Sequence, residues 1–148
     1  MRSRKNGGKP MTRTNISTGG KLEETYGYSR AVRVGNVIKV AGTCAVKDGK
    51  PYAPGDAAEQ TRKIFATISA ALETAGASLG DIVINRIFVT NIDDSDAVGK
   101  VHNEIFGAVR PACTLVGSSA LILPEFLVEI ECEAIVSEDT HENPGTTH

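Results

Sequence analysis

Three glutamates near the C-terminus stand at alternate positions of the sequence. Glu129, Glu131 and Glu133 alternate with apolar residues through residues 127–136. Side chains of a β-strand point to opposite faces in turn, so all three carboxylates should share one face of a sheet. Carboxylates there must meet water, a cation, or basic groups of this chain or another subunit, because unpaired buried charges are costly. We expect Glu131 and Glu133 to pair with Arg86 or with a neighbouring chain.

The cysteine and histidine side chains give weaker evidence of a functional site than the glutamates do. Cys44, Cys113 and Cys132 form no C-x-x-C pair, and His102 is the only histidine outside the C-terminal tail. This set lacks the ligand types and spacing of a zinc site, so we expect no metal and no cofactor. An odd number of unpaired cysteines is typical of reduced thiols in the cytoplasm.

The first secondary structure that we expect in the folded part of the chain is a β-hairpin. Residues 31–41 contain two β-prone runs around Gly35-Asn36, and a two-residue Gly/Asn connection favours a β-hairpin. We expect the second strand to continue through Val46 and to stop at the turn residues 47–51.

Two helices should follow. Asp56 and Glu59 form a candidate capping box for the first, which should end at Gly76 in a left-handed conformation. Its apolar stripe consists of Ala57, Thr61, Ile64, Ile68, Leu72 and Ala75. The second helix should begin after the capping residues 91–95 and end near Gly107; its apolar side consists of Val98, Val101, Ile105 and Phe106.

Further strands are expected at residues 82–90, 112–118 and 127–136, with Arg110-Pro111 forcing an extended start to the second of these. The element order is β-β-α-β-α-β-β. This order predicts an α+β fold with one sheet, covered on one face by two helices.

Bulk properties limit the function classes. The 148 residues carry a net charge of −2 and 41% hydrophobic residues, which is typical of one globular domain and argues against nucleic acid as a partner. No apolar run approaches the roughly 20 residues that span a bilayer, so we expect no membrane partner. We predict a disordered arm at 1–11, one domain at 12–136 and a disordered tail at 137–148.

An ordered set of short motifs resembles the Rid/YjgF family of reactive-intermediate deaminases, whose members are also described as endoribonucleases or translation inhibitors. The motifs are Tyr28-Ser-Arg-Ala-Val32, Val40-Ala-Gly-Thr43, Glu59-Gln-Thr-Arg62, Ala75-Gly-Ala-Ser-Leu79, Asp81-Ile-Val83, Arg110-Pro-Ala112 and Leu127-Val-Glu-Ile-Glu131. The resemblance implies a chorismate-mutase-like homotrimer with a central barrel and a ligand cleft at each subunit boundary. It also implies hydrolysis of imines or enamines without a cofactor.

The resemblance further implies a site. Glu129 matches the glutamate that handles the attacking water, Tyr28 the tyrosine that closes the cleft, and Gly42 the glycine after the second strand. The candidate substrate-binding residues are Tyr28, Gly42, Thr43, Cys44, Phe88, Cys113, Thr114 and Glu129, and the candidate catalytic residues are Glu129 and Cys113.

One position departs from the family pattern. Where the family has an arginine that holds the substrate carboxylate, this chain has Cys113. A guanidinium binds a carboxylate with two charge-assisted hydrogen bonds, whereas a neutral thiol is a weak donor. Losing such a pair costs about 2–5 kcal/mol of ligand binding, so we do not expect efficient 2-iminoacid deamination. The family's asparagine and tyrosine on the second helix are Gly99 and His102 here.

Each candidate residue also has a plainer interpretation. Cys113 is either a nucleophile activated by His102 or a small residue that fills the space of the arginine, and Cys44 either edges the site or packs. Glu129 either orients water or lies on a solvated face, and Tyr28 is either a lid or a surface ring. Arg110 is either an anion anchor or a solvated loop residue.

Three functions remain open on the sequence. The first is a small-molecule hydrolase that acts on a C=N bond at the trimer interface. The second is a non-catalytic metabolite sensor or chaperone-like module that uses the same cleft. The third, a ribonuclease or translation inhibitor, predicts a basic and aromatic surface, and the sequence has neither net positive charge nor a tryptophan.

Overall fold

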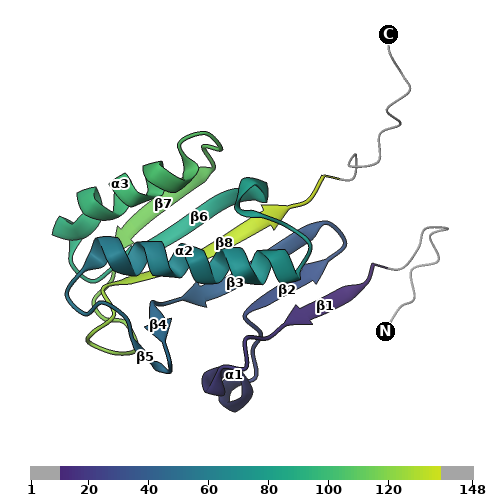
Figure 1. The fold of residues 1–148 in the computed structure, drawn as a ribbon, viewed down its shortest axis with the longest axis horizontal. Coiled ribbons are helices and arrows are strands. Elements are labelled where there is room, and N and C mark those ends of the chain that lie inside the picture. Colours follow the sequence, from purple (N-terminus) through teal and green to yellow (C-terminus); the bar gives the residue numbers. More distant parts are fainter. Residues whose placement is uncertain (1–10, 138–148) are drawn as a thin grey trace, which may run out of the picture.

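The computed structural model describes residues 11–137, in which one mixed sheet carries two long helices on one face (Figure 1). The predicted α+β class with a helix-covered sheet is therefore confirmed. In spatial order the strands are β1 (Arg13–Ile16), β2 (Ala31–Val34), β3 (Val37–Thr43), β8 (Val128–Ile135), β6 (Ile82–Val89) and β7 (Ala112–Gly117). Apart from Met11 and Ser137, the predicted arm and tail lie outside the described residues.

Strand pairing is antiparallel throughout the sheet except at one edge. The predicted hairpin is confirmed, with Val34 opposite Val37 and Gly35 at φ +58°, as the first central residue of a primed turn requires. β8 pairs with β3 and β6, whereas β7 runs parallel to β6 and leaves its outer edge unpaired. The register between β3 and β8 shifts between Val40 and Thr43.

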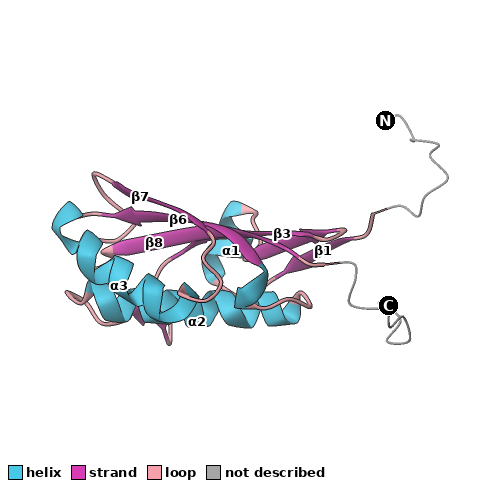
Figure 2. Cartoon of the chain, turned by 90° about the horizontal axis from the view of Figure 1, so that it is seen from above, coloured by secondary structure: helices cyan, strands magenta, loops and turns pink. Residues whose placement is uncertain are grey.

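The helices cover the sheet face on which the apolar side chains converge. α2 (Ala57–Thr74) begins at Asp56, whose side chain accepts a hydrogen bond from the Glu59 N–H, and Gly76 follows at φ +84° as predicted. α3 (Ser95–Phe106) ends one residue before Gly107. Figure 2 shows α2 and α3 on the same side of the sheet. Burying this face drives the packing, because apolar burial contributes roughly 25 cal/mol per Å².

Strand β8 supplies the centre of the core, with alternation as predicted. Val128, Ile130, Cys132 and Ala134 are each at most 2% exposed and face the helices. We call the opposite sheet face, which carries Glu129, Glu131 and Glu133 of β8 with Lys39 of β3 and Arg86 of β6, the open face. Neither α2 nor α3 covers it (Figure 2).

Four local predictions need correction. β3 ends at Thr43 instead of continuing to Val46, and a separate short hairpin of β4 (Val46–Lys47) and β5 (Lys50–Pro51) follows. Glu59 does not complete a capping box with Asp56, because its carboxylate forms an ion pair with Arg62. Residues 12–30, for which no element was predicted, contain β1 and the six-residue helix α1 (Lys21–Tyr26).

The fourth correction concerns the segment after α3. Arg110 is not extended before Pro111; it has φ +55°, in the left-handed region that a residue with a Cβ rarely adopts. In this conformation its N–H donates a 2.8 Å hydrogen bond to the Phe106 carbonyl. The bond satisfies a carbonyl at the helix end, a role that left-handed C-terminal residues commonly have.

Candidate functional site

The charges on the open face are largely paired within the chain. The Lys39 ammonium donates to Glu133, and the Arg86 guanidinium lies 3.7 Å from both Glu131 and Glu133. The prediction that Glu131 and Glu133 pair with Arg86 is therefore confirmed. The hydrogen bond from Lys39, above all, holds the pKa of Glu133 below its usual range. These two glutamates are consequently engaged by cations and are poor candidates for acting on water.

Glu129 has a different environment from its two neighbours in β8. Within residues 11–137 no basic side chain lies within ion-pair distance of its carboxylate. Instead the Cys44 thiol donates a hydrogen bond to Oε1 at 3.3 Å. A carboxylate that is free of ion pairs keeps its remaining lone pairs for another donor, such as water.

Gly42 makes room for this carboxylate. A methyl group added at Gly42 would lie 3.1 Å from Cδ and 3.3 Å from Oε2 of Glu129, closer than ordinary van der Waals contact. The backbone of Gly42 is not left-handed, so the glycine is needed here for close approach rather than for its conformational freedom. The structure thus places Gly42, Cys44 and Glu129 together.

The Cys44 thiol is a proton donor here and is not an activated nucleophile. Burial, followed by the negative charge of Glu129, raises its pKa far above the usual range. A thiolate is the reactive form of cysteine, so a raised pKa keeps this sulfur unreactive. Its contribution is therefore the hydrogen bond that fixes one oxygen of Glu129.

Arg30 lies beside this group and was not singled out by the sequence reasoning. Its Nη1 donates to Oγ1 of Thr43 at 3.2 Å, and its guanidinium carbon lies 5.7 Å from the centre of the Tyr28 ring. Thr43 directly precedes Cys44 in the chain, so this bond places the guanidinium near the thiol, and its positive charge counteracts part of the rise in the pKa of Cys44. The hairpin register contained the signal: Ala31 pairs with Val40, so Arg30 must lie opposite Ala41, next to Gly42.

A hollow of about 440 Å³ opens on the same face beside Tyr28. Strands β1, β2 and β3 form its floor, and the Tyr28 ring, 40% exposed, stands at its side. The lining residues are Arg13, Asn15, Gly27, Tyr28, Ser29, Val32, Lys39, Val40, Ala41 and Glu131. The hollow is therefore adjacent to the Glu129 group and does not include it.

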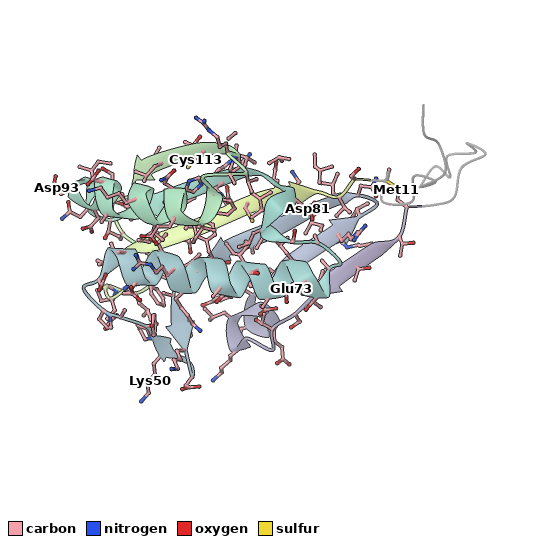
Figure 3. The ribbon with its side chains drawn as sticks, turned by 45° about the horizontal axis from the view of Figure 1, so that its top comes forward. Met11, Lys50, Glu73, Asp81, Asp93 and Cys113 are labelled. Carbon is pink, nitrogen blue, oxygen red and sulfur yellow. The ribbon has the colours of Figure 1, made fainter. Side chains whose placement is uncertain are left out.

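Cys113 lies on the other face of the sheet. It pairs with Asn85 of β6, and Asn85 is fully buried toward α3, where its Nδ2 lies 3.0 Å from Nε2 of His102. Paired residues of neighbouring strands point the same way, so Cys113 also points to the helix side, exposed at the unpaired edge of β7 (Figure 3). Within one chain, Cys113 and Glu129 therefore do not face the same hollow.

The residues around Cys113 do not activate it. Cys113 is exposed as a residue, but partial burial of its thiol raises the pKa of that group, and burial lowers the pKa of His102. His102 packs against Phe106, with ring centres 4.8 Å apart, and is therefore part of an aromatic cluster. The alternative of a thiolate nucleophile paired with an imidazolium gains no support from this arrangement.

The remaining predicted site residues lie either in the group around Glu129 or on the edge strand β7. Phe88 pairs with Glu129 across β6 and β8 and shares the open face with it. Thr43 is buried beside Arg30, and Thr114 pairs with Arg86 on the exposed edge strand. One chain therefore brings together Tyr28, Gly42, Thr43, Cys44, Phe88 and Glu129, but not Cys113.

The acidic segment at 91–96 is explained by helix capping. The Asn91 side chain accepts a hydrogen bond from the Asp93 N–H at 3.0 Å, as expected at a helix start. Residues 11–137 contain no group of three or more His, Cys, Asp or Glu side chains that could hold a metal ion. None of the helices in that part of the chain combines the length and apolar character needed to cross a bilayer.

Comparisons with known proteins agree on one family across most of the chain. A family model described as Endoribonuclease L-PSP matches residues 18–136. An uncharacterized protein of Streptomyces coelicolor is 37% identical over 119 residues, which cover 80% of this chain and 89% of that protein. The mitochondrial protein mmf2 of Schizosaccharomyces pombe is 36% identical over 129 residues, covering 87% of this chain and 97% of the relative.

Solved structures give the same result. A Mycobacterium tuberculosis protein described as a member of a highly conserved YjgF family matches with a TM-score of 0.77 and 46% identity, covering 84% of this chain and 100% of that one. A Yersinia pestis protein of the Rid family matches with a TM-score of 0.74 and 30% identity, with the same coverage of both chains.

Proposed function

We propose that this chain, which belongs to the Endoribonuclease L-PSP family, also called YjgF or Rid, binds a small metabolite and hydrolyses an imine or enamine in it. The observation that carries this proposal is the environment of Glu129. Its carboxylate is free of ion pairs, fixed by the Cys44 thiol, and placed against Gly42 on the open face.

The chemistry requires a base for water and no cofactor. Glu129 accepts a proton from a water molecule while the oxygen of that water attacks the C=N carbon and the electron pair of the double bond moves to nitrogen. Glu129 passes this proton to the nitrogen, which gives a neutral carbinolamine. The carbinolamine hydroxyl then transfers its proton to the nitrogen, the C–N bond breaks, its electron pair leaves with ammonia, and a C=O group forms. The net reaction adds one water across C=N and releases one ammonia. General base catalysis of this kind typically contributes about 10²- to 10⁴-fold in rate.

We propose a homotrimer as the active form. Cys113 and Glu129 point to opposite faces of one sheet, so a site that contains both needs two copies of the chain. The open face also exposes Val37 and Val116 beside its ion pairs, and an uncovered apolar and charged surface of this kind suits a partner subunit. Light scattering should give three times the 15.6 kDa chain mass, and a monomer at working concentrations would contradict the assembly.

A non-catalytic role is the second candidate, and Cys113 is the observation that favours it. The thiol carries no charge and cannot clamp a substrate carboxylate as the family's arginine would. A metabolite sensor or chaperone-like module would then use the same cleft. It would show ligand-induced thermal stabilisation without turnover.

A ribonuclease function, which the name of the family model suggests, has weaker support. The open face presents three glutamates, and the net charge is −2. Binding of single-stranded RNA relies on basic grooves and stacked aromatic rings. Nuclease activity that co-purifies with the protein and disappears on mutation of Glu129 would restore this function.

The decisive experiment measures ammonia release from 2-iminoacids generated in situ. We compare the wild-type protein, Glu129→Gln and the control Glu73→Gln, which removes an exposed carboxylate from α2. Because Cys113 replaces the arginine, we expect only a modest acceleration over buffer with the wild type and the control, and its complete loss with Glu129→Gln. No acceleration over buffer, or equal rates for Glu129→Gln and wild type, would rule out the catalytic form.

We propose the cytoplasm as the location, because Cys44, Cys113 and Cys132 are all unpaired thiols. The relatives mmf1 and mmf2 of Schizosaccharomyces pombe are described as mitochondrial, so a mitochondrial location is the competing outcome. Cell fractionation with an antibody against the full chain distinguishes the two.

A further inference from the structure

We propose that Glu23 is a positioning residue, whose buried carboxylate holds the segment between β1 and β2 in the conformation that places the Tyr28 ring beside the Glu129 group. Glu23 contacts no reacting atom and acts through Tyr28. Its effect on catalysis rests on the proposed function, whereas its effect on the position of Tyr28 does not, so the two are tested separately.

The side chain of Glu23 fixes the start of this segment. Glu23 is 8% exposed and is the only buried residue of α1 (Lys21–Tyr26). Its Oε2 accepts hydrogen bonds from the Thr18 hydroxyl at 2.6 Å and from the Gly20 N–H at 3.3 Å. A methyl group added at Gly20 would lie 2.9 Å from this oxygen, so the glycine provides the space that the carboxylate occupies. The two bonds therefore join the loop before α1 to the helix.

The backbone of Glu23 fixes the end of the segment. Its carbonyl accepts hydrogen bonds from the Gly27 N–H at 2.9 Å and from the Tyr28 N–H at 3.0 Å. Gly27 has φ +73°, the left-handed conformation that glycine readily adopts at the end of a helix. The next residue, Ser29, accepts a 2.9 Å bond from the Asn15 side chain on β1. One residue is thus bonded both to the loop before α1 and to the backbone of Tyr28.

Tyr28 links this segment to the candidate site. Its ring lies 5.7 Å from the guanidinium carbon of Arg30, whose Nη1 donates to Thr43 in the group around Glu129. The ring also stands at the side of the hollow of about 440 Å³. In Figure 1, α1 lies at the ends of β1 and β2, away from the two long helices. A shift of the backbone at Tyr28 would therefore move the ring relative to the site while the helix-covered core stays in place.

The buried carboxylate orders the segment at a cost in stability. Its Oε1 is shielded from solvent and has no hydrogen-bond partner in the described part of the chain, and an unpaired buried acceptor is unfavourable. Burial on its own would raise the pKa of Glu23, but the hydrogen bonds, above all from Thr18, hold it below its usual range, so the group is ionised at neutral pH. α1 buries no apolar side chain, and a helix of six residues is not stable by itself. Departures of this kind from the usual rules of packing are expected where a segment serves a site.

The first test follows the Tyr28 ring directly. The intact protein is labelled with fluorotyrosine, its fluorine NMR spectrum is recorded, and Tyr28→Phe assigns the Tyr28 resonance. Glu23→Ala and Thr18→Val, which removes only the hydroxyl donor, should both shift or broaden this resonance. They should leave the resonance of Tyr52, whose ring packs against the core, unchanged. Glu23→Gln, whose amide oxygen can still accept from Thr18, should shift the Tyr28 resonance less. The matched control is Glu24→Ala, which removes an exposed carboxylate from the same helix and should shift neither resonance.

The second test is a double-mutant cycle on ammonia release from 2-iminoacids. Glu23→Ala should lower kcat/KM on the order of ten- to hundredfold in the wild-type background, and Glu23→Gln should lower it less. In the Tyr28→Ala background the same substitution should have almost no further effect, because a residue that acts through Tyr28 then has nothing left to position. Glu24→Ala should leave the rate unchanged in both backgrounds.

An unchanged Tyr28 resonance in Glu23→Ala overturns the inference, and so does a change that moves Tyr52 equally, which would make Glu23 a residue of general stability. If Glu23→Ala does not fold, the same criteria apply to Thr18→Val. Equal losses of kcat/KM from Glu23→Ala in the wild-type and Tyr28→Ala backgrounds also overturn it. If the wild type does not accelerate ammonia release, the proposed function fails, whereas a selective shift of the Tyr28 resonance still establishes that Glu23 positions the ring.

Discussion

Replacing Gln60 with leucine should destabilise the protein more than any exposed substitution on the same helix. Gln60 is fully buried in α2 and connects three separate segments. Its Nε2 donates to the carbonyls of Ala53, at 3.2 Å, and Glu125, at 2.8 Å, while its Oε1 accepts from the Leu127 N–H at 2.9 Å. These bonds hold the loop that leads into β8, two residues before Glu129.

The expected magnitude follows from the groups left behind. Leucine is about one methylene group larger than glutamine, so the loss comes mainly from hydrogen bonding, and any overpacking adds to it. Each net hydrogen bond contributes about 1 kcal/mol, and a buried N–H or carbonyl left unpaired costs about 1–3 kcal/mol. Three bonds therefore predict a loss of about 3 kcal/mol in the free energy of unfolding.

Urea unfolding at fixed protein concentration, followed by circular dichroism, measures this loss. Fixing the concentration matters because stability of an oligomer depends on it. The control is Thr74→Ala, which removes an exposed hydrogen bond to the Ala70 carbonyl on the same helix and should cost less than about 0.5 kcal/mol. Hydrogen exchange at the Leu127 amide should also accelerate in Gln60→Leu. A loss below about 1 kcal/mol with normal exchange at Leu127 would refute the reasoning.

Three further predictions concern the site and the titratable groups. Gly42→Ala should keep the fold but displace the Glu129 side chain by a few tenths of an ångström. This displacement should lower any Glu129-dependent rate by about tenfold or more. An unchanged rate would contradict a functional need for the close approach of Glu129 to Gly42. Iodoacetamide near pH 8 should modify the exposed Cys113 of the folded protein long before Cys132, because burial raises the pKa of Cys132 to about 12. Peptide mass mapping measures the order of modification. Modification of Cys132 before Cys113 would contradict the burial of Cys132. Burial lowers the pKa of His102 below 6.5, so as the pH falls the unfolded chain binds a proton at this residue before the folded protein does. The free energy of unfolding should therefore decline below about pH 6.5, and the decline should be smaller in His102→Gln. Identical pH profiles of the two proteins in urea unfolding would refute the assignment.

The elements that the sequence predicted well have their own apolar periodicity. α2 buries Ile64, Ile68 and Leu72 along one stripe, and β8 buries every second residue. Such patterns follow from local geometry and need no knowledge of the neighbours. The Gly35-Asn36 turn similarly fixes the hairpin by its own conformation.

The elements that the sequence did not predict depend on distant contacts. β1 buries only Ile16, and α1 buries only Glu23, whose carboxylate accepts from the Thr18 hydroxyl at 2.6 Å and caps the helix. Neither segment has an apolar stripe, so each forms because the rest of the sheet or a cap stabilises it. Arg110 is comparable, since its left-handed backbone serves a carbonyl of the preceding helix.

The site was predicted in its residue types but not in its geometry. Strand alternation placed Glu129 with the other glutamates, and only the packed structure separates it from them by leaving it without a cation. The opposite facing of Cys113 follows from the parallel pairing of β6 with β7, which a linear pattern does not reveal. Arg30 could have been found by extending the hairpin register one step beyond Ala31.

The register shift in β3 determines which side chain of that segment lies next to the Glu129 carboxylate. From Val40 opposite Cys132 to Thr43 opposite Ile130, β3 advances three residues while β8 advances two. The extra residue inverts odd and even positions downstream, so Thr43 turns inward and Cys44 reaches Glu129. If the intact sequence paired with β8 without this extra residue, simple alternation would place Thr43 opposite Glu129 and turn Cys44 inward, so Glu129 would have a hydroxyl neighbour in place of sulfur.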